Sequence, residues 1–134
     1  MFQFSKASDE CLSTVNPTLQ TIMRNAIKNS PIDFGIPKSG GLRTAEEQYE
    51  LFQDNKTKCD GYTKLSNHQS GNAVDVYAYV NGKASWQEHH LAMIAGVVLA
   101  EAKRMGVKLC WGGTFGKKGK NLDGWDKPHF ELSD

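Results

Sequence analysis

The sequence predicts an α+β fold in which an antiparallel sheet is flanked by helices. Helical apolar spacing or capping patterns mark three segments, at residues 16–31, 44–53 and 85–106. Four short segments rich in β-branched and aromatic residues are predicted strands: 32–37, 73–80, 107–111 and 129–132. Helices precede most of the strands, and the two kinds of element do not alternate as βαβ units, which favours an antiparallel sheet.

The first long helix is predicted in NPTLQTIMRNAIKNSP. Asn16 suits the N-cap, Pro17 suits the first helical position, and Pro31 limits the helix at its other end. Its apolar side chains recur at helical spacing and form one stripe: Leu19, Ile22, Met23, Ala26 and Ile27. A shorter helical turn is predicted to precede it from Ser8.

The second helix is predicted in TAEEQYELFQ, where Thr44 is followed three residues later by Glu47. This is a capping-box pattern, in which each of the two side chains accepts a hydrogen bond from the backbone amide of the other residue. Tyr49 or Leu51, together with Phe52, is expected to face the core.

The third and longest helix is predicted to begin at Ser85, with Glu88 three residues later, and to end at Gly106. The turn signal Asn81-Gly82 lies just before it and closes the second strand. Its apolar positions predict that it covers the sheet: Leu91, Ile94, Ala95, Val98, Leu99 and Ala102.

Length, charge and cysteine usage limit the class of protein. The chain has 134 residues, the usual size of one domain, so residues 1–134 are predicted to form a single domain with one core. Sixteen basic and fifteen acidic residues give a net charge of +1, which argues against nucleic acid or an anionic membrane as the main partner. Cys11, Cys59 and Cys110 are odd in number and widely spaced, and we predict that they are reduced.

The second strand carries an acidic residue near its start. Alternation along residues 73–80 puts Asp75 on the face opposite to a row of core residues, Val74, Val76, Ala78 and Val80. Gly71 lets the chain bend, so that His68 can fold back toward Asp75. A lone histidine in a polar loop is usually solvated, and an aspartate at a strand edge often caps a turn. This pair alone therefore leaves two interpretations open: a shared metal site, or two unrelated surface residues.

A second polar group accompanies the last strand, in GWDKPHFELSD. Pro128 removes an amide donor, and strand alternation puts His129 and Glu131 on one face, which predicts that His129 is exposed rather than buried. Asp126 stands three residues before His129, close enough to lie beside a metal that His129 binds.

These residues offer two imidazoles and a carboxylate, a ligand set of hydrolytic zinc sites that leave the fourth position for water. His68, Asp75 and His129 are therefore the candidate ligands. Zinc polarises a carbonyl and lowers the pKa of water toward about 7, so a carboxylate that accepts a proton completes a peptidase mechanism. Asp126 is the candidate base. Glu131 is expected to support the site or to have a surface role rather than to act as the base, because its Cα lies two residues along the strand from His129, roughly 7 Å away.

The two remaining histidines do not form an HExxH zinc motif, because Glu88 precedes both His89 and His90. They are predicted to be surface residues. The lysines of GKKGKN are predicted to form a solvated loop, with a basic lip beside a site for an acidic substrate as the alternative.

SNHQSGNAVDV resembles the S-x-H-x-x-G-x-A-x-D motif of the zinc peptidases that share the hedgehog/D-Ala-D-Ala peptidase fold. WDKPHFEL resembles their second motif, an acid three residues before a histidine, and GGLRTAEEQYELF is similar to their G-x-R-S/T-x-x-x-Q segment. These landmarks occur in the family's order and cover residues 40–132. The resemblance implies that His68, Asp75 and His129 bind zinc and that Asp126 is the catalytic acid/base.

The same resemblance assigns supporting residues. It implies that Arg43 binds and polarises the substrate carbonyl, that Gln48 supports the site, and that Ser66 and Gly71 belong to the framework of the first motif. The chain departs from many relatives at Thr114, where they carry an acid, and in the Gly/Lys-rich segment TFGKKGKNLDG that follows WGG. This departure concerns the shape of the substrate groove rather than the metal.

Within the family, the short chain, its NPTLQTIMRNAIKNSP opening and the VNGKASW step are most similar to phage endolysins that are L-alanyl-D-glutamate peptidases. An aspartate rather than a glutamate at Asp126 is in keeping with this branch. The resemblance implies hydrolysis of the peptidoglycan stem peptide between L-Ala and D-Glu during host lysis. Two alternatives stay open: a D,D- or L,D-carboxypeptidase that removes a terminal D-Ala, and a cell-wall binding module that keeps zinc without turnover.

The amino terminus, MFQFSKASDE, lacks a basic region followed by an apolar stretch, and the apolar run near LAMIAGVVLA is too short to span a bilayer. We therefore predict synthesis in the host cytoplasm without membrane insertion. The resemblance to endolysins implies that a holin then releases the protein to the cell wall. A small, nearly neutral domain is predicted to be a monomer.

Overall fold

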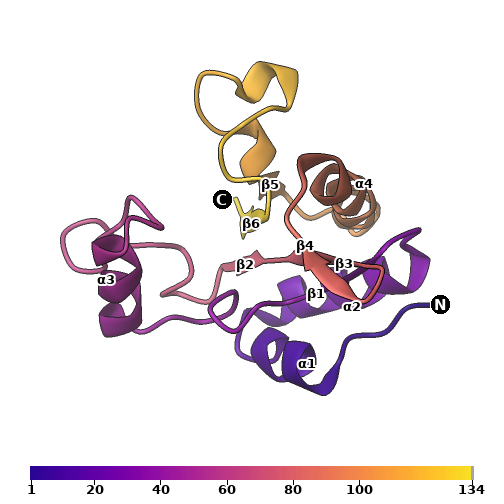
Figure 1. Cartoon of the computed structure of the whole chain (residues 1–134), viewed down its shortest axis with the longest axis horizontal. Coiled ribbons are helices and arrows are strands. Elements are labelled where there is room, and N and C mark those ends of the chain that lie inside the picture. The colour runs from indigo at the N-terminus through magenta and orange to yellow at the C-terminus, as the bar shows by residue number, and fades with distance from the viewer. Residues whose placement is uncertain (134) are drawn as a thin grey trace.

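Two three-stranded antiparallel sheets form the centre of the fold (Figure 1). The computed structural model describes residues 1–133. One sheet has the order β1-β3-β4 and the other has the order β2-β6-β5. The strands are β1 Asp33–Gly35, β2 Ala73–Asp75, β3 Tyr77–Val80, β4 Lys83–Ser85, β5 Leu109–Trp111 and β6 His129–Leu132. The helices are α1 Lys6–Leu12, α2 Pro17–Asn29, α3 Ala45–Gln53 and α4 Glu88–Arg104, with 3-10 turns η1 Gly112–Thr114 and η2 Gly119–Asn121.

The segment predicted as one strand, residues 73–80, contributes to both sheets. β2 pairs with β6, while β3 pairs with β1 and β4. The change of partners falls at Val76, whose amide donates to the Pro128 carbonyl at 2.9 Å instead of to a strand of either sheet. The prediction of a single sheet is therefore wrong, although the alternation holds: Val74, Val76 and Ala78 are fully buried.

The core lies between the sheets and two long helices. α2 begins at its predicted N-cap, where the Asn16 side chain accepts a hydrogen bond from the Thr18 amide at 2.9 Å. The five residues of its predicted stripe are all buried. α4 packs against α2, β3 and β5, which confirms that the longest helix covers sheet strands. The shorter first helix begins at Lys6, two residues before the predicted start.

The predicted start of the longest helix is wrong, because Ser85 belongs to β4 and the helix begins at Glu88. The turn between β3 and β4 explains this. Asn81 and Gly82 both have positive φ angles, 52° and 78°, as type I′ hairpin turns require. The hairpin pairs Ser85 with Ala78 and so extends the strand through the position that the capping pattern had suggested.

α3 stands apart from both sheets (Figure 1). Its capping box forms as predicted between Thr44 and Glu47. The expectation that its aromatic residues face the core is wrong, because Tyr49 and Phe52 are each 40% exposed and stack on one another. Gln48 is the residue that α3 buries. The inner face of α3 therefore meets polar groups of the neighbouring loops rather than an apolar layer.

The three cysteines are free thiols, as their number and spacing predicted. Among residues 1–133, no helix has the length and apolar character that crossing a membrane requires.

Candidate active site

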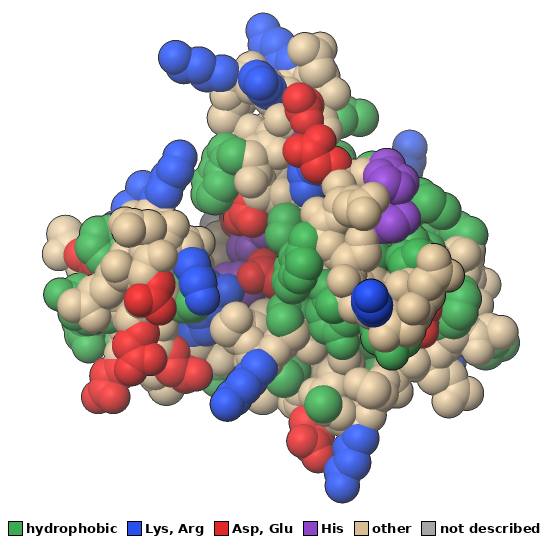
Figure 2. Space-filling view, in the orientation of Figure 1, with side chains coloured by type: hydrophobic (Ala, Val, Ile, Leu, Met, Phe, Trp, Pro, Cys, Tyr) green, Lys and Arg blue, Asp and Glu red, His purple; other side chains and the backbone are tan. Residues whose placement is uncertain are grey.

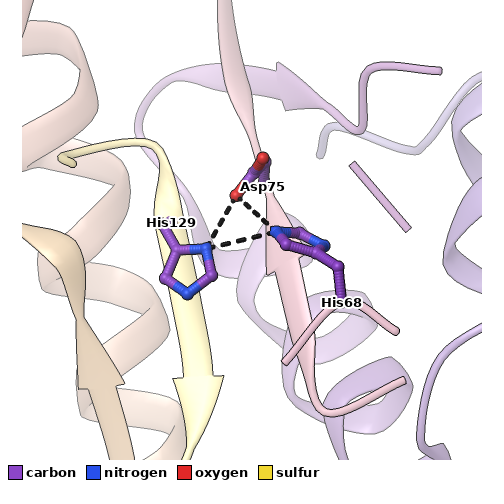
Figure 3. A group of neighbouring side chains, drawn as sticks. All are labelled: His68, Asp75 and His129. Carbon is purple, nitrogen blue, oxygen red and sulfur yellow. Dashed lines mark hydrogen bonds and ion pairs between the residues drawn. The ribbon is translucent and has the colours of Figure 1, made fainter. Parts of the chain in front are cut away.

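Three of the predicted site residues converge where β2 meets β6 (Figure 3). The register of these antiparallel strands places Asp75 directly opposite His129. His68 comes from the turn before β2 and points its ring into the same space. The sheet pairing therefore brings together residues that lie far apart in the sequence.

The donor atoms of the three side chains form a nearly equilateral triangle. His68 Nε2 lies 3.2 Å from Asp75 Oδ1 and 3.2 Å from His129 Nδ1, and the latter two atoms are 3.0 Å apart. Ligand atoms bound to a tetrahedral zinc ion at about 2.0–2.1 Å lie roughly 3.3 Å from one another. The three residues therefore fit a zinc ion in both chemistry and spacing.

Hydrogen bonds to the opposite ring nitrogens select the tautomers that a metal site needs. His68 Nδ1 donates to the Gly41 carbonyl at 3.0 Å, so its Nε2 carries the lone pair. His129 Nε2 donates to the Glu131 carboxylate at 2.8 Å, so in the neutral ring its Nδ1 carries the lone pair. Asn67 in turn donates to Glu131 at 2.7 Å. Such acceptors behind ligating histidines fix the ring orientation and raise the basicity of the ligand.

The site is more enclosed than the sequence predicted. His129 is only 7% exposed and His68 only 2%, so the expectation that His129 is exposed is wrong. The reason is tertiary, because the ring of Phe115 packs 5.8 Å from that of His129 and the ring of His68 packs 5.0 Å from it.

Ionisable groups at the site have shifted pKa values. Burial opposes the charged form of Asp75, but hydrogen bonds from His129 and His68 outweigh it and hold the pKa of this carboxyl well below its usual range. Burial also opposes a charged His129, yet the hydrogen bond to Asp75 and the nearby carboxylates raise the pKa of His129 to about 9. The cluster thus strongly favours a positive charge at its centre.

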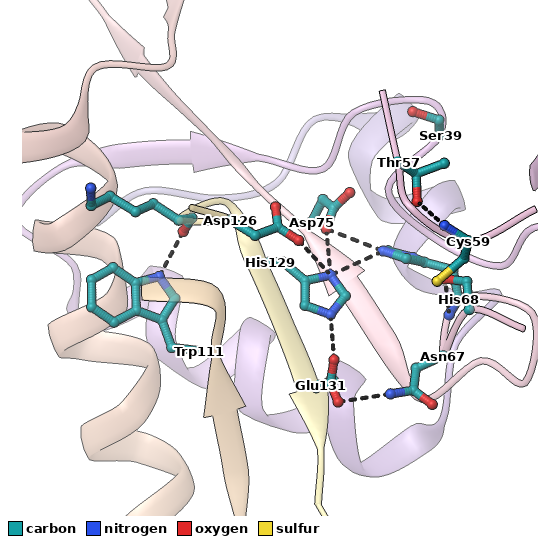
Figure 4. Close-up of polar contacts among 12 residues, drawn as sticks. Ser39, Thr57, Cys59, Asn67, His68, Asp75, Trp111, Asp126, His129 and Glu131 are labelled. Atoms are coloured by element: carbon teal, nitrogen blue, oxygen red, sulfur yellow. Dashed lines mark hydrogen bonds and ion pairs between the residues drawn. The ribbon is translucent and has the colours of Figure 1, made fainter. Parts of the chain in front are cut away.

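Asp126 lies beside this cluster, with Oδ2 3.9 Å from His129 Nδ1 (Figure 4). Its carboxylate is directed toward the three donors and retains 29% exposure of its side chain. Burial raises the pKa of Asp126 above the usual value for aspartate. A carboxyl group with a raised pKa next to a metal position is suited to accepting and returning a proton.

The backbone around Asp126 depends on a close approach that only glycine permits. A Cβ atom built on Gly112 would lie 1.6 Å from the Asp126 carbonyl oxygen. The Asp126 amide also donates to the Gly112 carbonyl at 3.4 Å. The WGG sequence thus has a structural role in placing Asp126.

We predict that Gly112→Ala destabilises the protein by roughly 1–3 kcal/mol, because the added methyl group must displace the Asp126 backbone. Gly96→Ala is the matched control: it lies in α4 with nothing within 4 Å of its Cβ position, so it should gain about 0.5–1 kcal/mol from helix propensity. Urea unfolding of the two variants checks both signs. Equal stabilities would contradict the steric argument.

Arg43 and Gln48 form a buried support for Asp75. The Arg43 guanidinium donates to Asp75 Oδ2 at 2.9 Å, to the Gln48 side chain at 3.1 Å and to the Ser39 carbonyl at 2.7 Å. Gln48 donates to the Cys59 carbonyl at 2.9 Å and so ties α3 to the loop that follows it. The structure thus places both residues of the predicted supporting segment next to the candidate ligands.

Ser66 and Gly71 shape the turn that carries His68. The Ser66 hydroxyl accepts from the His68 amide at 3.2 Å. Gly71 has a φ of +78°, a conformation that side chains disfavour, and its carbonyl accepts from the Asn16 amide at 2.9 Å. The first motif is therefore a turn that is anchored to the start of α2.

A groove of about 270 Å³ leads to the candidate ligands. Figure 2 shows it as a hollow with histidine and acidic side chains at its floor. The groove is also lined by residues that were not assigned to the site from the sequence, among them Lys58, Phe115 and Trp125. For Trp125 and Phe115 the sequence offered one signal, their proximity to recognised motifs: Trp125 precedes Asp126, and Phe115 follows WGGT. Lys58 has no such signal, because only the folded loop brings it to them.

We predict that Glu131→Gln lowers activity about tenfold, at the mild end of the 10–100-fold range for residues behind metal ligands. The glutamine keeps a carbonyl that can accept from His129 Nε2 but removes the negative charge. Measurement of kcat/KM together with bound metal checks this result. A loss as severe as that of Asp126→Asn would contradict the assignment of Glu131 as a supporting residue.

Comparisons with known proteins cover nearly the whole chain. The family model for phage L-alanyl-D-glutamate peptidase matches residues 1–133. The L-alanyl-D-glutamate peptidase of Escherichia phage T5 is 31% identical over 137 residues, which cover 98% of this chain and 98% of that protein.

Two solved structures confirm the predicted α+β fold. The L-Ala D-Glu endopeptidase ChiX of Serratia marcescens has a TM-score of 0.81 at 31% identity, covering 99% of this chain and 90% of its own. The vancomycin-resistance D,D-dipeptidase VanXYg has a TM-score of 0.56 at 13% identity, covering 88% of this chain and 50% of its own. The second likeness concerns the fold alone.

Proposed function

The chain belongs to the phage L-alanyl-D-glutamate peptidase family and is a peptidase, and from this premise we propose how it cuts the cell wall. The proposed reaction is hydrolysis of the amide bond between L-Ala and D-Glu in the peptidoglycan stem peptide. The observation that carries the mechanism is the convergence of three metal-ligating atoms beside a fourth, partly buried carboxylate.

We assign zinc as the cofactor, held by His68 Nε2, Asp75 Oδ1 and His129 Nδ1. Support comes from the mutual distances of 3.0–3.2 Å and from the two hydrogen bonds that, in the neutral rings, leave lone pairs on the nitrogens that face the cluster. When bound, zinc supplies Lewis-acid chemistry: it polarises a carbonyl and makes water more acidic.

Asp126 is the proton carrier in this mechanism. Its carboxylate accepts a proton from the attacking water and returns it to the nitrogen of the leaving D-Glu, so that the cleaved amine departs neutral. The raised pKa of Asp126 suits both transfers, because a carboxyl that is too acidic accepts a proton poorly. Its position beside His129 keeps it within reach of the reacting atoms.

The other residues orient the reactants. Arg43 lines the groove and is proposed to bind the carbonyl oxygen of the substrate while its ion pair holds Asp75 in place. Gln48 positions the guanidinium, Ser66 holds the turn of His68, and Glu131 holds the ring of His129. Each of these contacts reduces the motion of a group that must be placed within a fraction of an ångström.

The biological setting follows from the family. We propose that the protein is an endolysin that acts as a monomer on the host cell wall at the end of phage infection. Release through a holin-opened membrane would bring it to its substrate.

The direct test is digestion of purified peptidoglycan by the zinc-loaded protein, with and without a chelator. Mass spectrometry of the released fragments and labelling of new amino termini identify the bond. New D-Glu amino termini that disappear with the chelator are the expected result. Released free D-Ala would instead identify a carboxypeptidase, and bound zinc without any cleavage would identify a binding module.

A further inference from the structure

The two walls of the groove differ in chemistry. Three lysines, Lys56, Lys58 and Lys64, line the side formed by the loop after α3. None of them pairs with an acidic side chain of residues 1–133, whereas Lys127 is paired with both Asp123 and Glu88. Figure 2 shows lysine or arginine side chains beside the hollow on the α3 side. Among the described residues, the positive charge of these three lysines is therefore not neutralised by an ion pair.

Lys58 reaches across the groove to the opposite wall. Its Nζ atom lies 4.5 Å from the centre of the Trp125 ring, a cation–π contact. Trp125 immediately precedes Asp126 and is 56% exposed, and Phe115 packs 6.1 Å from it. The ammonium group of Lys58 thus lies over Trp125, the neighbour of the proposed proton carrier Asp126. Because Trp125 is exposed, a ligand can reach this position.

The proposed substrate has a carboxylate at the corresponding place. D-Glu in the stem peptide is joined through its amino group to L-Ala and through its side-chain carboxyl to the next residue, so its α-carboxylate is free. The carbon of that carboxylate lies only about 2.5 Å from the scissile nitrogen, as backbone geometry requires. Since Asp126 must reach this nitrogen, the α-carboxylate enters the same side of the groove.

A carboxylate in this position needs a cation beside it. Asp126 and Glu131 line the floor of the groove, neither forms an ion pair with a lysine or arginine of residues 1–133, and like charges in a partly buried site repel one another. We infer that Lys58 binds the α-carboxylate of D-Glu, with Lys56 and Lys64 adding to the attractive field. The enzyme then prefers stem peptides with free D-Glu over those in which this group is amidated to D-isoglutamine. This inference rests on the proposed function.

The test compares two N-acetylated tetrapeptides, L-Ala-γ-D-Glu-L-Lys-D-Ala and its D-isoglutamine counterpart, with the zinc-loaded full chain. The wild-type protein is expected to cleave the D-Glu peptide with a kcat/KM about 10–100-fold higher, the usual range for a charge-assisted hydrogen bond. In Lys58→Met the preference should fall to about threefold or less, and Lys58→Arg should restore part of it.

Lys120→Met is the matched control, since it removes the same charge from an exposed position that does not line the groove. It should keep the full preference. Equal cleavage of the two peptides by the wild type, or an unchanged preference in Lys58→Met, would overturn the inference while leaving the proposed function intact.

A binding measurement separates this inference from the failure of catalysis. The dipeptide γ-D-Glu-L-Lys, which carries the leaving amine, is titrated into the zinc-loaded protein while the indole N–H signal of Trp125 is followed by NMR. The signal is assigned by its absence in Trp125→Phe. Its chemical shift should change on addition of this dipeptide. At equal concentration, D-isoglutaminyl-L-Lys should change it at least tenfold less. Equal shifts would overturn the inference even if neither tetrapeptide were cleaved, an outcome that would refute the proposed function separately.

Discussion

Asp126→Asn is expected to lower kcat by about 10²- to 10⁴-fold, the usual contribution of a general acid–base group. Asparagine has nearly the same shape, so the groove and the three metal-ligating atoms should stay in place. It cannot accept a proton from water or return one to the leaving amine. Steady-state kinetics on the L-Ala-γ-D-Glu peptide, combined with metal analysis, measures both effects.

The zinc content of Asp126→Asn decides which role its loss of activity assigns to Asp126. Full zinc occupancy with the predicted loss of kcat supports Asp126 as the proton carrier. Loss of zinc would instead make it a metal ligand, and full activity would remove it from the mechanism. Glu131→Gln is the paired control, because it neutralises another carboxylate near His129. Its smaller expected loss of activity shows that the effect of Asp126→Asn is specific to Asp126.

Removal of the metal is expected to abolish peptidoglycan cleavage, and added zinc should restore it. The folded state should also become more stable with zinc, because a ligand at 100 times its Kd adds about 2.7 kcal/mol to the free energy of unfolding. Thermal unfolding of the chelated protein with and without added zinc measures the corresponding rise in Tm. Peptidase assays on the same samples measure the activity.

Variants at histidines separate site binding from incidental binding. His129→Ala should lose both the zinc-dependent rise in Tm and the activity, since it removes one of the three converging donors. His89→Ala, at an exposed histidine of α4, should keep both. A zinc response that survives in His129→Ala but disappears in His89→Ala would place the functional metal elsewhere.

Elements with local signals could be predicted from the sequence. Asn16 and Pro17 mark the start of α2 because capping is decided within a few residues, and the stripe of α2 is buried as its spacing predicted. The Asn81-Gly82 turn forms for the same reason, since its backbone conformation depends on those two residues themselves.

Similar local signals failed where tertiary contacts competed with them. The capping-box pattern occurs at both Thr44 and Ser85, but of these two only Thr44 caps a helix, because Ser85 pairs with Ala78 in the β3–β4 hairpin. The aromatic residues of α3 look like core residues in the sequence, yet Tyr49 and Phe52 are exposed and Gln48 takes the buried position. Periodicity shows which residues share a face, not what the face meets.

The sequence by itself determined the family and which residues are candidates for the site. The spacing of His68 and Asp75, the acid three residues before His129 and the segment that contains Arg43 and Gln48 indicate the family and predict the chemistry without coordinates. These motifs depend only on residue types and on short spacings along the chain, both of which can be read directly from the sequence.

Only the tertiary structure decided the geometry that the chemistry needs. His68 and His129 are 61 residues apart, and the register of β2 against β6 brings their nitrogens to 3.2 Å. Folding also buries His129, selects both tautomers and carries Lys58 to Trp125. The physical reason is that strand register and loop packing are set by contacts between distant segments, and local periodicity carries no information on which segments will meet.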